Sequence, residues 1–211
     1  STWDEKMIIR CISKDSYNNL WIGGKSPIGF VQIYDSEKNS VSIFDYGLTD
    51  ITKFYIGDSI ALASFIDGQD IGLIKWKYSD NKWSYRDIYR NFPFFIEKIN
   101  GIEIVNQHVF LGTDSGLLIG HLRENLKDPN NWELVSNEYN SSIDAMRRIG
   151  NSFAFILGQN IYKVIYDDDA FQYEQLEVQT PVGFSDFIID EDDFVWGLYN
   201  KKVYSQKNNF Y

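Results

Sequence analysis

One short phrase recurs along this chain and constrains its fold more than any other feature. The phrase joins a polar turn pair to four or five mostly apolar residues, as in "NNLWIGG" from Asn18 and "DDFVWGL" from Asp192. Three further lines follow the same plan: "DSIALAS" from Asp58, "QHVFLGT" from Gln107 and "NSFAFIL" from Asn151. Self-similarity at intervals of about 40 to 50 residues indicates a repeat architecture, and four short strands per repeat indicate propeller blades.

The segments around each phrase predict the remaining strands. Apolar-rich segments precede it and begin near residues 8, 51, 96, 143 and 184, and two further strand-like segments follow it. The central runs are almost continuously apolar, as expected for buried strands, whereas the outer ones alternate. We therefore predict an all-β fold, with residues 1–211 forming a single β-propeller domain of four-stranded blades. Five in-phase units make a β-sandwich or two small β-domains a poorer interpretation.

The two ends of the sequence bear on the number of blades. The opening "STWDEKM" is strand-like, and the closing "NNFY" resembles the start of an outer strand. The two ends could therefore share one blade and close a ring of five, which would remove free sheet edges. A slice of a larger propeller is the alternative. We read "GHLRENLKD" (120–128) as a strand end and loop.

Composition excludes several classes of partner. The net charge is −10 and the pI is about 4.6, so the surface repels nucleic acid and anionic lipid. Cys11 is the only cysteine, which excludes an intrachain disulfide and thiolate metal clusters. No apolar run approaches about 18 residues, so we expect no membrane insertion of this segment. Because the sequence starts with neither an initiator Met nor an apolar leader, we expect a processed or excised soluble piece.

The sequence offers no convincing catalytic or metal-binding motif. His108 and His121 are the only histidines, and they lack both a nucleophile elbow and the close spacing of metal ligands. The acidic runs at 167–169 and 190–193 lack the glycine of a calcium loop, and "IGG" lacks the lysine of a phosphate loop. We predict no cofactor and no metal site.

Carboxylates on the predicted inner strands support one enzymatic alternative. Glycoside hydrolases place two carboxylates across the sugar ring, and Glu97, Asp144 and Asp186 occupy corresponding places in the repeats. However, Arg10, Lys53 and Lys98 lie at neighbouring positions. Mixed charge is an ordinary way to keep a propeller channel wet, so a glycosidase is the less favoured prediction.

Aromatic residues are better candidates for ligand binding. Trp21 and Trp196 fall within central strands, where we predict packing between blades. The connections that lead to the next inner strand are "YRNFPFF" (89–95), "EYNSS" (138–142) and "TPVGF" (180–184). Loops on a rigid scaffold concentrate binding residues, and flat aromatic rings suit sugars or peptide side chains.

Two resemblances point to exported bacterial proteins. "KDSYNNLWIGG" (14–24) resembles the regulator-propeller repeat of periplasmic sensor regions in bacterial hybrid two-component systems. "VFLGTDSGLLIG" (109–120) resembles a later part of that repeat, "IIDEDDFVWGLYNKKVYSQ" (188–206) matches more loosely, and two units depart from the pattern. "GLLIGHLRENLKDPNNWELVS" (116–136) is similar to the propeller of the outer-surface component of the type IX secretion system. These resemblances imply a periplasmic or cell-surface location.

We therefore expect a non-catalytic binding or sensing propeller that recognises an oligosaccharide or a protein partner through one face. The alternative is a structural module of a secreted or envelope complex. The candidate ligand-binding residues are Arg10, Lys53, Tyr89, Phe92, Phe94, Lys98, Tyr139, Asp144, Arg147 and Asp186.

Overall fold

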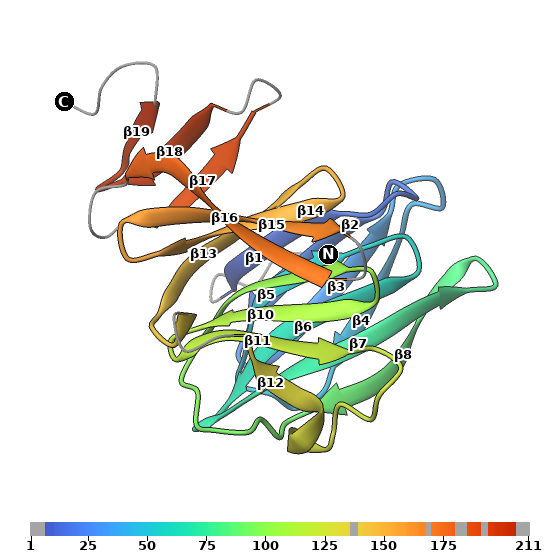
Figure 1. Ribbon diagram of the computed structural model, residues 1–211. Helices are drawn as coiled ribbons and strands as arrows, with labels where there is room; N and C mark the ends of the chain where they lie inside the picture. Colours follow the sequence, from blue (N-terminus) through green and yellow to red (C-terminus); the bar gives the residue numbers. More distant parts are fainter. Residues whose placement is uncertain (1–6, 136–138, 168–169, 180–184, 191–193, 206–211) are drawn as a thin grey trace. The chain divides into compact units, whose positions relative to one another are not determined.

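The computed structural model describes residues 7–135, 139–167, 170–179, 185–190 and 194–205. The chain divides into two compact units, and each is described here by itself. Unit 1 comprises residues 1–92 and 126–129, and unit 2 comprises residues 93–125 and 130–211. Every sheet in both units is an antiparallel meander of strands that follow one another in the sequence (Figure 1).

Unit 1 contains two four-stranded sheets, blade 1 and blade 2. Blade 1 is formed by β1 (Ile8–Lys14), β2 (Leu20–Lys25), β3 (Gly29–Asp35) and β4 (Ser40–Asp45). Blade 2 is formed by β5 (Asp50–Ile56), β6 (Ile60–Asp67), β7 (Asp70–Ser79) and β8 (Lys82–Tyr89).

Unit 2 contains blades 3, 4 and 5, of which the last has three described strands. Blade 3 is formed by β9 (Ile99–Val105), β10 (His108–Thr113), β11 (Gly116–His121) and β12 (Trp132–Leu134), which a short 3₁₀ helix (Pro129–Asn131) precedes. Blade 4 is formed by β13 (Ile143–Ile149), β14 (Ser152–Leu157), β15 (Asn160–Asp167) and β16 (Ala170–Gln179). Blade 5 is formed by β17 (Asp186–Ile189), β18 (Val195–Tyr199) and β19 (Lys202–Ser205).

Two-residue hairpin turns define several strand boundaries. The pairs at 80–81, 106–107 and 200–201 all have positive φ at both positions, which is the geometry of a type I′ turn. Asn and Asp adopt this left-handed conformation more readily than most side chains do. The polar turn pairs in the sequence therefore fix where these strands end.

The structure confirms the predicted fold class, since the chain is all-β and its sheets are propeller blades. One predicted boundary is wrong: the inner strand of blade 3 begins at Ile99, so Glu97 and Lys98 lie in the loop before it. The segment 120–128 is a strand end and loop, as predicted. The closing strands predicted at 1–7 and 208–211 lie almost entirely outside the described residues, so ring closure and the single-domain organisation stay predictions.

Trp21 anchors blade 1 on blade 2 within unit 1. Its side chain is fully buried, and its ring lies edge-on to Phe54, Trp76 and Trp83 of blade 2, with centroid distances between 5.1 and 5.8 Å. Gly23, on the same face, leaves space for this packing, because a Cβ there would lie 2.7 Å from the Phe54 ring. The predicted role of Trp21 between blades is confirmed.

Met146 and paired aromatic rings hold blades 3 and 4 together within unit 2. Met146 lies against Gly101 and Gly112, where a Cβ would come within 2.5 Å of its side chain. Phe110 of β10 packs against Phe153 of β14 at a centroid distance of 4.8 Å. Close approach at the two glycines therefore lets one flexible side chain fill the gap between sheets.

The packing between blades that the sequence predicts for Trp196 is not seen among the described residues, where its side chain is 40% exposed. Blade 5 packs on blade 4 through its opposite face, where Phe187 and Val195 are buried. The alignment of the recurring phrases from Asn18 and Asp192 pairs Trp21 with Val195, which is wrong by one residue. Trp21 is the second residue of β2 and Trp196 is the second residue of β18, so Val195 corresponds to Leu20. Among the described residues, no helix has the length and apolar character needed to cross a membrane.

A buried carboxyl group in blade 3 makes the stability of unit 2 depend on pH. Burial raises the pKa of Glu103 to about 7, although the guanidinium groups of Arg148 and Arg147 oppose the shift. The folded chain therefore holds this proton more tightly than the unfolded chain, and we expect the free energy of unfolding to fall as the pH rises from about 4.5 to about 7. Glu103→Gln, which stays neutral, is expected to flatten this slope in urea unfolding curves recorded across that range.

The matched control is Glu97→Gln, because Glu97 is exposed in the loop before β9. It should leave the slope of the wild type unchanged. Parallel pH profiles for the wild type and Glu103→Gln would contradict the assignment.

Candidate functional site

A groove of about 630 Å³ lies at one end of the sheets of unit 1. Three hairpin turns form its walls: the β1–β2 turn at 15–19, the β3–β4 turn at 35–40 and the β7–β8 turn at 79–82. Two come from blade 1 and one from blade 2, so the groove depends on the packing of these blades. The 89–95 connection leaves β8 at its other end, so the groove is not on the side predicted from the sequence.

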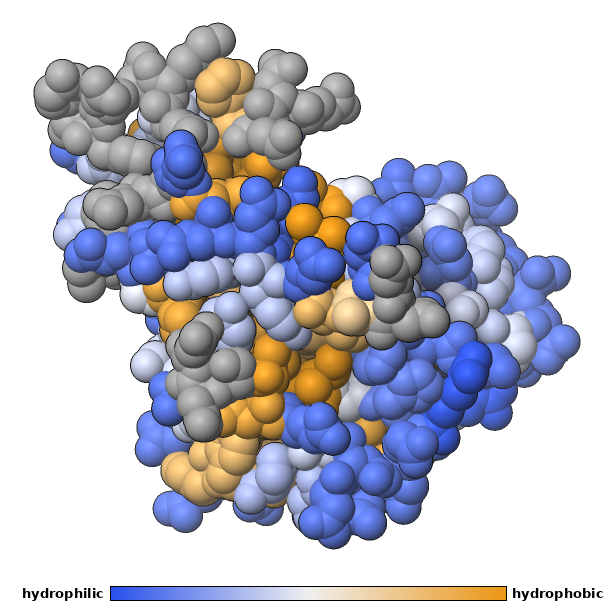
Figure 2. All heavy atoms as spheres, in the orientation of Figure 1, coloured by the Kyte–Doolittle hydropathy of each residue, from blue (hydrophilic) through white to orange (hydrophobic). Residues whose placement is uncertain are grey.

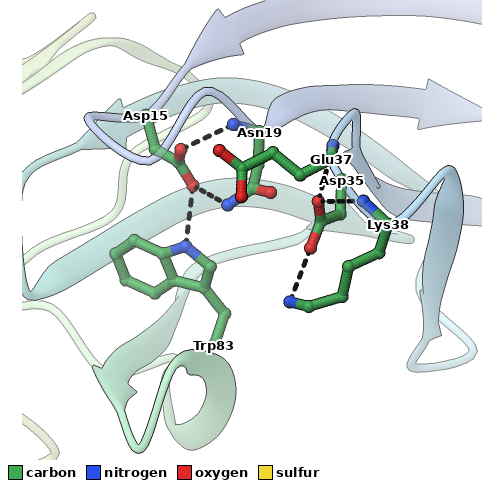
Figure 3. A network of polar contacts seen from close by, with 6 residues as sticks. All are labelled: Asp15, Asn19, Asp35, Glu37, Lys38 and Trp83. Atoms are coloured by element: carbon green, nitrogen blue, oxygen red, sulfur yellow. Dashed lines mark hydrogen bonds and ion pairs between the residues drawn. The ribbon is translucent and has the colours of Figure 1, made fainter.

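Asp15 organises the base of this groove (Figure 3). Its carboxylate accepts hydrogen bonds from the backbone N–H groups of Tyr17 and Asn19 and from the Asn19 side chain, at 2.8 to 2.9 Å. It also accepts the indole N–H groups of Trp21 at 3.1 Å and of Trp83 at 2.8 Å. One carboxylate therefore joins a turn of blade 1 to the outer strand of blade 2.

The hydrogen bonds to Asp15 also set its protonation state. Burial by itself favours the neutral acid, but the donors on Asn19, Trp21 and Trp83 outweigh burial and hold the pKa of Asp15 below its ordinary value. Asp15 is therefore ionised at neutral pH, and both of its carboxylate oxygens accept hydrogen bonds from the protein itself. We assign it to positioning the groove rather than to binding within it.

The β3–β4 turn is held by a second carboxylate (Figure 3). Asp35 accepts the backbone N–H groups of Glu37 and Lys38 at 3.0 Å and pairs with the Lys38 ammonium at 2.7 Å. The side chain of Lys38 is exposed, so its charge reaches the solvent side of the groove. This pair shapes the wall and neutralises part of its charge.

Aromatic rings line the groove beside these polar groups. Tyr17 and Tyr78 stack with a centroid distance of 3.8 Å and an interplanar angle of 16°. The Tyr17 hydroxyl donates to the backbone carbonyl of Asp58 at 2.9 Å, which ties this ring to blade 2. Phe44 and Trp83 also contribute to the lining. The groove thus offers flat apolar surfaces whose positions are fixed by packing and hydrogen bonds.

The remaining lining is mostly hydroxyl and amide groups. The neutral polar residues are Ser16, Asn18, Asn19, Ser40, Ser42 and Asn81. Two acidic residues, Asp35 and Glu37, are balanced by Lys38 and Lys82. Within the described residues, no three histidine, cysteine or carboxylate side chains lie together in a way that could hold a metal ion. The groove is therefore suited to a neutral ligand with many hydroxyl groups.

The predicted site residues of unit 1 lie elsewhere. Arg10 of β1 pairs with Asp50 of β5 at 3.0 Å, and Lys53 is half-buried on β5. Tyr89 is buried at the end of β8, so it packs in the core, and Phe92 is half-buried in the connection that follows. Arg10 therefore joins the inner strands of blades 1 and 2, and Tyr89 supports the core of blade 2.

The predicted site residues of unit 2 fall into two groups. Arg147 of β13 forms an ion pair with Asp186 of β17, and Asp144 accepts a hydrogen bond from the Ser142 hydroxyl at 3.0 Å. The other three are spread over the unit: Lys98 is exposed, Phe94 is half-buried and Tyr139 lies in the core. The 180–184 connection lies outside the described residues.

The two histidines are closer than their sequence spacing indicates. His108 and His121 face each other across β10 and β11, with ring centroids 4.6 Å apart, and Phe171 lies edge-on to His108. Partial burial lowers the pKa of His108. The pair packs within an aromatic cluster of unit 2.

None of the ten predicted site residues is among the residues that line the groove. The groove residues come from the turns of "KDSYNN" and from the alternating "NSVSIF", which the sequence marks as ordinary turn and outer-strand residues. Only the alignment of the three hairpins brings these residues together. Hydroxyl groups at alternate positions, Ser40 and Ser42, were the available signal.

The fold defines this chain as one built of β-propeller blades, and comparison with known proteins agrees. No protein-family profile matches the chain, and neither does any curated protein. A similar solved structure is PorZ of Porphyromonas gingivalis, a surface component of the type IX secretion system, with a TM-score of 0.62 and 19% identity over 93% of this chain. The Dos1 propeller has a TM-score of 0.60 and 16% identity over 89% of the chain.

The extracellular domain of a hybrid two-component system from B. thetaiotaomicron is also similar, with a TM-score of 0.55 and 13% identity over 90% of this chain. These likenesses establish the fold. They include both kinds of propeller that the sequence resembles. The chain spans 27% of the PorZ chain, 50% of the Dos1 chain and 25% of the sensor domain.

Proposed function

We propose that this chain is a non-catalytic binding module of an exported bacterial protein and that it recognises a neutral oligosaccharide in the groove of unit 1. The observation that carries the proposal is the lining of the groove, where fixed aromatic rings stand beside hydroxyl and amide groups with balanced charge. Oligosaccharides present both apolar ring faces and many hydroxyl groups. In this groove, the aromatic rings can pack against the apolar ring faces while the hydroxyl and amide groups hydrogen-bond to the sugar hydroxyls.

Support for an exported, sensing role comes from the similar structures. PorZ is a bacterial surface component, and the B. thetaiotaomicron domain is the extracellular part of a two-component system. A ligand-binding propeller outside the cytoplasm would suit the periplasm or the cell surface. Sensing would then require the bound state to be passed to further parts of a longer polypeptide.

A thermal-shift screen with neutral oligosaccharides at millimolar concentration tests the proposal. A ligand at about 100 times its dissociation constant should stabilise the folded chain by roughly 2.7 kcal/mol and raise the melting temperature by a few degrees. Tyr17→Ala removes a half-exposed ring from the groove. We expect it to weaken binding by about two- to tenfold, which is the range that one aromatic stacking contact usually contributes.

Phe95→Ala is the matched control, because Phe95 is 71% exposed and is not among the residues that line the groove. It should bind the same oligosaccharide as tightly as the wild type. A loss of binding in Phe95→Ala with none in Tyr17→Ala would place the site in the connection predicted from the sequence. No shift with any oligosaccharide would contradict the glycan proposal.

A structural or assembly role is the second candidate. The observation that favours it is an exposed apolar face on blade 5, which carries Ile188, Trp196 and Val203. A glycoside hydrolase is less favoured, because Asp186 is engaged by Arg147. If the chain hydrolysed glycosides, Asp144→Asn or Asp186→Asn would abolish turnover of a substrate panel that the wild type cleaves.

A further inference from the structure

The Asp15–Trp21 arrangement is part of an established interface between blades. In blade 1, the Trp21 indole donates to Asp15 Oδ2 at 3.1 Å, and the Asn19 backbone N–H donates to Asp15 Oδ1 at 2.8 Å. The Asp15 N–H donates back to the Asn19 carbonyl at 3.1 Å. The loop and the tryptophan form one rigid element, and blade 2 covers its outer side.

Blade 5 repeats these three hydrogen bonds at the same residue spacing. The Trp196 indole donates to Asp190 Oδ2 at 2.9 Å, and the Phe194 backbone N–H donates to Asp190 Oδ1 at 3.0 Å. The Asp190 N–H donates back to the Phe194 carbonyl at 3.0 Å. Blades 1 and 5 therefore share a local structure down to individual hydrogen bonds.

The strand registers place the two tryptophans on equivalent faces. Trp21 lies opposite Ser13 on one neighbouring strand and Ile33 on the other. Trp196 lies opposite Ile188 and Ser205 in the same way. Since directly opposed residues point to one face of an antiparallel sheet, Trp196 lies on the face that a following blade covers in the case of blade 1.

This face of blade 5 is apolar and exposed. Its side chains include Ile188, Trp196, Leu198 and Val203, which are 58%, 40%, 38% and 70% exposed. Figure 2 shows apolar atoms at the surface in the region of β17–β19. Large apolar side chains gathered on one sheet face, beside a tryptophan already held in its packing geometry, mark an interaction surface.

We infer that this face docks a further propeller blade, supplied by polypeptide outside these 211 residues. The interface would continue the one that Trp21 makes with blade 2, and the similar PorZ and sensor structures extend well beyond the part that this chain matches. The docking blade must differ from blade 2 in one respect. Blade 5 carries Leu198 where blade 1 has Gly23, and a Cβ at Gly23 would lie 2.7 Å from the Phe54 ring. The incoming inner strand therefore carries a smaller side chain in place of Phe54.

Fluorine NMR of chains labelled with fluorotryptophan tests the inference, with the Trp196 resonance assigned from Trp196→Phe. A soluble paramagnetic agent should broaden this resonance in the 211-residue chain. In the polypeptide made from the complete reading frame, the effect should fall at least about threefold, since a covered Trp196 approaches the full burial of Trp21. Trp21 should be protected in both.

Three results would overturn the inference. The first is a Trp196 that is equally accessible in the longer polypeptide, and the second is a reading frame that ends at Tyr211. The third is a Trp196 that is already protected from the paramagnetic agent in the 211-residue chain. If dilution of the protein then exposes Trp196, a second copy of the chain covers the face. If dilution has no effect, the five-blade closure predicted from the sequence holds instead.

A substitution of Val203, on the same exposed face of blade 5, tests the docking independently through the melting temperature. Val203→Lys should leave the melting temperature of the 211-residue chain within about 1 °C of the wild type, because Val203 is 70% exposed. In the longer polypeptide it should lower the melting temperature by several degrees, because the charge would be buried against the docked blade. Phe95→Lys, at a site 71% exposed, should have little effect in either chain. Equal effects of Val203→Lys in both chains would contradict the docking.

Discussion

Asp15→Ala is expected to lower the free energy of unfolding of unit 1 by about 3 kcal/mol, because it leaves several buried donors without an acceptor. The indole N–H groups of Trp21 and Trp83 and the backbone N–H of Asn19 all depend on this carboxylate. The loss should appear in urea unfolding followed by tryptophan fluorescence. It should also loosen the groove, since Asp15 joins a turn of blade 1 to the outer strand of blade 2.

Asp35→Ala is the matched control for this experiment. Asp35 also accepts two backbone N–H groups and a side-chain donor, but it lies in the exposed β3–β4 turn. Its loss should destabilise the chain much less than the loss of Asp15, because solvent screens an exposed ion pair. If Asp15→Ala and Asp35→Ala destabilised the chain equally, Asp15 would not be the buried hub described here.

The lowered pKa of Asp15 adds a pH dependence with a defined sign. The folded-state pKa lies below the unfolded value, so the stability contributed by Asp15 is present above the ordinary aspartate pKa of about 4. That stability is lost as the pH falls through the lowered pKa. The fall in stability below about pH 4 should accordingly be shallower in Asp15→Asn than in the wild type.

Phe110→Ala is expected to lower the free energy of unfolding of unit 2 by about 3 to 5 kcal/mol, which is the usual loss for truncating a fully buried phenylalanine. Phe110 is fully buried and packs against Phe153 of blade 4 at 4.8 Å and Phe171 at 4.9 Å. The cavity would therefore open at the contact between blades 3 and 4. Urea unfolding followed by circular dichroism would measure the loss.

Phe110→Leu fills most of this space and should cost only about 1 kcal/mol. Phe95→Ala removes a similar ring from an exposed site and should change the stability by less than about 0.5 kcal/mol. A loss below about 1 kcal/mol for Phe110→Ala would mean that the two blades do not depend on each other as this packing implies.

The strands of this chain could be predicted from the sequence because their signals are local. Polar turn pairs with left-handed backbone end the strands, and continuous apolar runs such as "VFLGT" mark the buried central ones. The apolar pattern predicts the inner strand of blade 3 three residues too early, because Ile96 is buried although it lies in the loop before Ile99. Apolar character alone does not distinguish these two positions.

The groove could not be predicted in this way because it depends on two blades meeting. The hydroxyl and amide groups of the 15–19, 35–40 and 79–82 turns are far apart in the sequence and typical of turns. The burial of Trp196 could not be predicted from the sequence either. Its sequence context matches that of Trp21, but burial depends on whether another blade packs beside it.

Fluorine NMR of the fluorotryptophan-labelled chain, titrated with the panel of neutral oligosaccharides, tests the central claim most directly. Trp83 lines the groove, whereas Trp132 and Trp196 do not. If the groove binds an oligosaccharide, the Trp83 resonance should move most and those of Trp132 and Trp196 should stay in place. Movement of Trp132 or Trp196 alone, or no movement of any resonance across the panel, would contradict the assignment of the groove as the binding site.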